Sequence, residues 1–223
     1  MRVYATTQVG TIGGGALEWE ATRIARTILT GPKVKIERKF PLGPNLGQCC
    51  GGAVTLTFER GIEPDHPLSI PIWIWGAGHV GRAIAGILQP IGIFDITLID
   101  TTATKLPDPM PHGVVPLVAS DPVRAIPHAP THADHFILTH SHDIDLALCD
   151  GLLRHSTGRI GLIGSHTKWV RFQRRLDKLG FTSSEISRIK CPIGDPKLGK
   201  HPQAIAIGVA AAMICHRQTV TKG

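Results

Sequence analysis

Residues 70–81 read IPIWIWGAGHVG and carry the clearest indication of the chain's fold. The apolar run 70–75 predicts a buried strand, and a G-x-G-x-x-G pattern follows it where a helix is expected to begin. In such a turn the first glycine permits the sharp bend, the second lets the backbone approach a pyrophosphate, and the third lets the helix pack on the strand. The amides at the helix start favour phosphate. Gly76, Gly78 and Gly81 are therefore candidate cofactor-binding residues.

An acidic residue follows at the place where a dinucleotide-binding unit carries one. Asp100 ends the next predicted strand, 95–100, which is close to where an acid binds the ribose hydroxyls. Because a carboxylate repels a 2′-phosphate, the sequence predicts that NAD is preferred over NADP if a nicotinamide dinucleotide binds. The plainer alternative is that the glycines serve only the fold.

The remainder of the region 70–223 alternates strands with helices. Further strands are predicted at 113–118, 135–140 and 159–164, and helices at 143–155, 168–180 and 203–216. This alternation predicts a Rossmann-like, doubly wound parallel sheet and an α/β fold class.

The region 1–60 is expected to form a small α+β domain, joined to the rest by a linker at 61–69. Pro and polar residues interrupt the apolar patterns in that linker. Within the small domain we predict a strand at 3–9, a helix that ends at Gly31-Pro32, and alternating strands near 34–40 and 54–58.

Two glycine-rich segments of the small domain are candidate sites. Gly13, Gly14 and Gly15 precede the predicted helix, so they form either an anion site or a plain strand-to-helix turn. Cys49 and Cys50 stand in the stretch GQCCGG, 47–52, whose glycines offer no side chains for packing. Thiolates bind soft metals and attack sulfur, and we interpret both cysteines as chemical; two buried structural cysteines are the alternative.

Further candidates follow two later strands. His140 lies in THSHDID, 139–145, and Ser165 and Lys168 open the helix after the next strand. Doubly wound sheets bind ligands at these ends, and a Gly-Ser turn with a lysine could hold a phosphate. Capping of a helix by Ser141 is the alternative at the first turn. The H-x-H-x-D-H metal pattern fails because Ile144 and Asp145 replace its last two residues, so no metal site is predicted.

Composition narrows the class of partner. The chain has 223 residues, 18% of them charged, and a net charge of +7, which an anionic small ligand would explain. One Tyr and six Phe offer little surface for base stacking, so nucleic acid is not expected. No apolar run reaches the roughly 18 residues of a membrane span, and five cysteines without a C-x-x-C pair suggest no disulfide framework. We therefore expect a cytoplasmic protein without a membrane partner.

Six motifs resemble, in the same order, those of the XdhC/CoxI family of xanthine dehydrogenase accessory proteins. They are GTIGGGALE at 10–18, LGPNLGQCCGG at 42–52, GAGHVG at 76–81, THSH at 139–142, GLIGS at 161–165 with Lys168, and CPIG at 191–194. They cover nearly the whole chain, and the cysteine loop ahead of a Rossmann fingerprint is distinctive.

The resemblance implies a maturation factor rather than a catalyst. It implies that the chain binds the molybdenum cofactor (molybdopterin), supports its sulfuration by a cysteine desulfurase, and delivers it to xanthine dehydrogenase or a related molybdenum hydroxylase. The pterin phosphate would lie against the turn 76–81, with Cys49 or Cys50 near the molybdenum or its incoming sulfur. We also expect a homo-oligomer. Family members usually extend further before Met1, so a truncated form or a mis-assigned start is expected, with an exposed sheet edge.

Two other classes of function remain open. One is an NAD(P)-dependent oxidoreductase, which the fingerprint and Asp100 permit, although the sole tyrosine, Tyr4, is not part of a Tyr–Lys pair. The other is a non-catalytic protein that senses a nucleotide.

Overall fold

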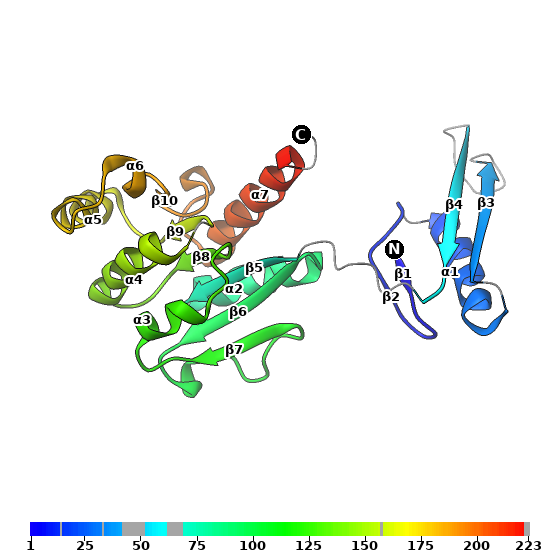
Figure 1. Ribbon diagram of the computed structural model, residues 1–223, viewed down its shortest axis with the longest axis horizontal. Coiled ribbons are helices and arrows are strands. Elements are labelled where there is room, and N and C mark those ends of the chain that lie inside the picture. Colours follow the sequence, from blue (N-terminus) through cyan, green and yellow to red (C-terminus); the bar gives the residue numbers. More distant parts are fainter. Residues whose placement is uncertain (14, 33, 42–51, 62–68, 157, 221–223) are drawn as a thin grey trace. The chain divides into compact units, whose positions relative to one another are not determined.

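The computed structural model describes residues 1–13, 15–32, 34–41, 52–61, 69–156 and 158–220 (Figure 1). The chain divides into two compact units, Met1–Pro67 and Leu68–Gly223.

The second unit is built on a parallel sheet. Its strands are β5 (Ile70–Trp75), β6 (Phe94–Asp100), β7 (Val114–Val118), β8 (Asp134–Ile137), β9 (Ile160–Leu162) and β10 (Ile189–Lys190). They lie in the order β10-β9-β8-β5-β6-β7, and every neighbouring pair is parallel. Two halves thus run outward from the adjacent strands β5 and β8, which is the order of a Rossmann sheet. The predicted fold class is confirmed.

Helices cover both faces of this sheet (Figure 1). They are α2 (His79–Leu88), α3 (Pro122–Ala125), α4 (His142–His155), α5 (His166–Lys178), α6 (Ser183–Ile186) and α7 (Pro202–Val220). Successive residues of a strand point to opposite faces. Accordingly, Ile72 and Ile74 pack with α2 and α7, whereas Trp73 and Trp75 pack with α3, α4 and α5. Both faces of β5 are therefore buried, as its apolar sequence predicts.

The first unit contains one helix, α1 (Gly15–Thr30), and two antiparallel hairpins in its described residues. Strands β3 (Lys35–Pro41) and β4 (Ala53–Glu59) pair in register from Lys35↔Glu59 to Pro41↔Ala53. Leu17, Ile24 and Ile28 of α1 form a small core with Phe40. The helix and both alternating strands lie where the sequence predicts them.

The predicted strand at 3–9 is wrong. That segment belongs to a short hairpin of β1 (Arg2–Val3) and β2 (Gln8–Val9), closed by a bond from the Tyr4 amide to the Thr7 carbonyl, 2.9 Å. The intervening residues are polar or small and offer no alternating apolar face, so an extended strand has no core to cover. Strand β10 was not predicted, because two residues are too few to show a period.

Candidate functional site

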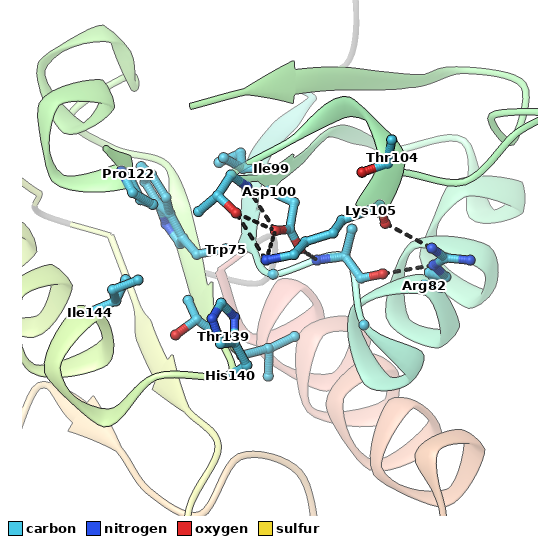
Figure 2. Close-up of a pocket in the computed structure, with 15 residues that line it drawn as sticks. Trp75, Arg82, Ile99, Asp100, Thr104, Lys105, Pro122, Thr139, His140 and Ile144 are labelled. Atoms are coloured by element: carbon cyan, nitrogen blue, oxygen red, sulfur yellow. Dashed lines mark hydrogen bonds and ion pairs between the residues drawn. The ribbon is translucent and has the colours of Figure 1, made fainter. Parts of the chain in front are cut away.

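A cavity of about 550 Å³ lies at the carboxyl ends of β5, β6 and β8 (Figure 2). Its apolar wall consists of Trp75, Ile99, Pro122, Leu138 and Ile144. Its polar residues include Asp100, Thr101, Lys105, Arg82 and His140. The cavity occupies the point where the strand order reverses, which is where open α/β sheets bind their ligands.

The three fingerprint glycines have different roles in the turn. Gly76 has φ +116°, and a Cβ there would lie 2.5 Å from the carbonyl oxygen of Leu138. A Cβ on Gly81 would lie 2.0 Å from the carbonyl oxygen of Gly76, so only glycine allows α2 to pack this closely on the turn. At Gly78 a Cβ would meet no protein atom within 4 Å, although the residue lines the cavity. The space beside its backbone is therefore open to a ligand.

Asp100 is engaged by the protein itself (Figure 2). Its Oδ2 accepts a hydrogen bond from the Ala77 amide at 2.9 Å, and its Oδ1 accepts one from the Thr101 amide at 2.7 Å. The Lys105 ammonium lies 3.7 Å from the same Oδ1. The carboxylate thus ties the fingerprint turn to the end of β6, and a ribose would have to compete with these donors.

The cavity is also lined by two cationic side chains that the sequence analysis did not single out, those of Arg82 and Lys105. Arg82 donates from Nε to the Ala77 carbonyl and from Nη2 to the Lys105 carbonyl, each at 2.7 Å. The Lys105 ammonium donates to Thr101 Oγ1 at 3.0 Å. The available signals were the position of Arg82 one helical turn after Gly78 and that of Lys105 in the polar loop after Asp100. Both are common patterns of solvated residues, so neither stands out.

A buried ion pair lies behind the cavity. Lys168 Nζ contacts Asp145 Oδ2 at 2.5 Å and also donates to the Ile163 carbonyl at 2.8 Å. The other oxygen of Asp145 accepts from the Thr139 hydroxyl at 2.6 Å and from the Thr139 amide at 3.2 Å. Thr139 lines the cavity. The network therefore fixes the turn after β8 to the start of α5.

The structure brings four of the predicted site residues to one place. Gly76, Gly78, Asp100 and His140 line the cavity. Gly81 supports the turn from within α2. Ser165 accepts a hydrogen bond from the Lys168 amide and caps α5, and neither it nor Lys168 is among the lining residues.

Of the candidates of the first unit, the structure describes Gly13 and Gly15. Gly13 and Gly15 have φ +112° and +66° and stand before and at the first residue of α1. The Glu18 carboxylate accepts a hydrogen bond from the Ile12 amide in the turn that leads into this helix. Gly14, Cys49 and Cys50 lie outside the described residues.

Two cysteines of the described region, Cys149 and Cys191, are poorly suited to thiolate chemistry because they are fully or partly buried. Burial raises the pKa of Cys149 far above its usual value and that of Cys191 to about 11. Both are therefore protonated thiols near neutral pH.

Among the described residues no group of three His, Cys, Asp or Glu is placed to hold a metal ion. A search of the same residues finds no helix long and apolar enough to cross a bilayer.

His135 sits under the cavity wall with no exposed surface. Its Nδ1 accepts a hydrogen bond from Trp75 Nε1 at 3.2 Å, and its Nε2 has no partner in the described part of the chain. Burial, with a smaller contribution from His155, lowers its pKa to about 3. The ring is thus neutral in the folded protein, whereas in the unfolded chain it binds a proton below about pH 6.5.

We predict that this difference makes the chain sensitive to mild acid. Between the two pKa values the unfolded state binds the extra proton, so the free energy of unfolding falls as the pH falls below about 6.5. In His135→Gln, whose amide oxygen can still accept from Trp75, the loss between pH 7 and pH 5 should shrink by about 2 kcal/mol. Urea unfolding at both pH values measures it. Identical pH dependence in the two proteins would contradict the assignment.

The sheet order, the glycine turn and the cavity define a Rossmann-type α/β protein with a small additional unit. The XdhC Rossmann domain matches residues 72–213, and the chain belongs to the XdhC family.

The chain is also similar to two known proteins. The chain is 30% identical over 211 residues to the uncharacterized protein YqeB of Escherichia coli (strain K12). That match covers 92% of this chain but 38% of YqeB, so the chain spans less than half of that relative. A crystal structure described as a xanthine dehydrogenase from Bacillus halodurans matches with a TM-score of 0.71 and 17% identity, over 96% of this chain and 84% of the other. At this identity the match supports the fold alone.

Proposed function

We propose that this chain binds the molybdenum cofactor, supports its sulfuration and delivers it to xanthine dehydrogenase or a related molybdenum hydroxylase. The observation that carries the proposal is the cavity at the fingerprint turn, where the Gly78 backbone borders open space. In this proposal the cofactor is cargo, and the chain's task is to hold and protect it. A cysteine desulfurase and the recipient hydroxylase are the expected partners.

The cavity has the chemistry that a phosphorylated pterin requires. Its apolar wall of Trp75, Ile99, Pro122, Leu138 and Ile144 suits a flat heterocycle, which gains by leaving water. A phosphate suits the amides of the turn and the start of α2. Arg82 and Lys105 add positive charge at the same opening. The cofactor's two ends would thus meet complementary surfaces.

The thiols complete the proposal from sequence alone. Since Cys149 is buried, Cys191 is half-buried and both thiols are protonated, Cys49 and Cys50 are the better candidates for contact with molybdenum or its sulfur. Sulfur transfer and simple coordination are both compatible with a thiolate at that position.

Replacement of Gly78 tests the site directly. We predict that Gly78→Val weakens molybdopterin binding at least about tenfold, or about 1.4 kcal/mol, because the side chain would occupy the space beside the turn. The fold should survive, since a Cβ there meets no protein atom within 4 Å. Gly86→Val is the matched control: Gly86 is an exposed glycine of α2 with equally open surroundings, and it does not line the cavity.

Fluorescence titration of the purified chain with molybdopterin provides the affinities, and circular dichroism confirms folding. Unchanged affinity in a folded Gly78→Val protein would remove this turn from the cofactor site.

A further inference from the structure

We infer that the cavity also binds a nucleotide whose ribose carries a phosphate, as NADP does, and that Lys105 and Arg82 hold that phosphate. This goes beyond cofactor delivery, because it adds a second class of ligand. It also reverses the preference for NAD that the position of Asp100 predicts from sequence.

Asp100 stands where an acid would normally bind the ribose diol. Both oxygens of Asp100 already accept hydrogen bonds from backbone amides, those of Ala77 and Thr101. Only 10% of its side chain is exposed. A ribose therefore gains little from this carboxylate, and the usual reason for preferring an unphosphorylated ribose is weakened.

The charges around Asp100 are a second feature that favours a phosphate. The Lys105 ammonium lies 3.7 Å from Asp100 Oδ1, which offsets the negative charge where it would repel a phosphate. Lys105 is 44% exposed, so its ammonium remains accessible from solvent. Arg82 adds a second positive charge, and among the described residues that line the cavity only Asp100 is negatively charged. The opening is therefore net positive next to the expected ribose position.

The fixed positions of Arg82 and Lys105 are a third feature that favours a phosphate. Arg82 bonds the carbonyls of Ala77 and Lys105, so its guanidinium is fixed between the fingerprint turn and the loop after β6 (Figure 2). Lys105 is fixed in the same loop through Thr101. An arginine beside the end of the second Rossmann strand is a common means of accepting a 2′-phosphate. Two oriented cations at this point make a specific receptor rather than a diffuse positive surface.

Adenosine 2′,5′-bisphosphate and adenosine 5′-monophosphate are suitable probes, since they differ only in the ribose phosphate. By calorimetry on the full chain, the bisphosphate should bind at least about tenfold more tightly. Lys105→Gln should reduce this ratio to below about threefold, and Lys105→Arg should retain it, because the charge is kept. Lys178→Gln, an exposed lysine of α5 away from the cavity, should leave the ratio unchanged.

Equal or tighter binding of the monophosphate, binding of neither probe, or a ratio that Lys105→Gln leaves intact would each overturn the inference. Molybdopterin binding is measured on the same protein samples, which separates the two proposals. A chain that binds molybdopterin without a preference between the probes refutes only the nucleotide site. A chain that shows the preference but binds no molybdopterin refutes only the proposed function.

Discussion

Lys168→Met is expected to destabilise the second unit by about 3–5 kcal/mol, the cost of leaving a buried charge without its partner. Asp145 has no exposed surface, and the side chain of Lys168 is 9% exposed. Methionine fills similar volume but removes the ammonium that contacts Asp145 Oδ2 at 2.5 Å. The remaining donor to Asp145, Thr139, is neutral and cannot compensate the carboxylate. Urea unfolding of the full chain measures the loss.

Two further variants make this experiment decisive. Lys178→Met changes an exposed lysine of the same helix and should alter stability by no more than about 0.5 kcal/mol. Adding Asp145→Asn to Lys168→Met removes the unpaired charge while keeping an acceptor for Thr139, so much of the lost stability should return. A loss below about 1 kcal/mol in Lys168→Met would mean that the pair is not buried as described.

The largest functional effect is expected from the paired cysteines. With both Cys49 and Cys50 replaced by alanine, activation of a partner molybdenum hydroxylase should be nearly abolished in a reconstitution assay. A thiolate is a better nucleophile and soft-metal ligand than a hydroxyl, so serine replacements should fail as well. Stability should change little, because flanking glycines offer no side-chain packing to lose.

The matched control for this double variant is Cys215→Ala, which removes an exposed thiol of α7 and should leave activation intact. If the Cys49/Cys50 double variant is folded, binds molybdopterin normally and still activates the hydroxylase fully, the thiols are bystanders. The sulfuration role proposed for this chain would then be wrong.

Much of the Rossmann unit could be predicted from sequence because its signals are local. Strand β5 has an uninterrupted apolar run, and two of the glycines that follow it, Gly76 and Gly81, are required by a close backbone approach that no side chain would allow. Helix α4 and the later strands follow the same alternation, although β8 ends at Ile137, earlier than the 135–140 predicted. His140 therefore lies in the turn, which is where a ligand-facing residue belongs.

The polar contacts of the site could not be read from sequence, because they depend on residues far apart in the chain. Asp145 entered the sequence argument only as a residue that breaks a metal pattern, yet it accepts a hydrogen bond from Thr139 and pairs with Lys168, 23 positions further along the chain. The position of Asp100 predicted a ribose contact, but its neighbours Ala77 and Thr101 supply the hydrogen bonds that it accepts. Spacing locates a carboxylate and does not show which donors surround it.

The bond between Asp100 and the Ala77 amide has a consequence for the energetics of ligand binding. A glycine-rich turn is normally free to sample many conformations, and a ligand that orders it loses affinity in proportion. Here Asp100 Oδ2 holds the turn through the Ala77 amide, and Arg82 holds the carbonyl of the same residue. The conformational entropy is therefore lost when the chain folds, and an incoming phosphate meets a preorganised surface. The turn is therefore ordered before any ligand arrives, and the free energy of its contacts with a ligand is not reduced by the cost of ordering it.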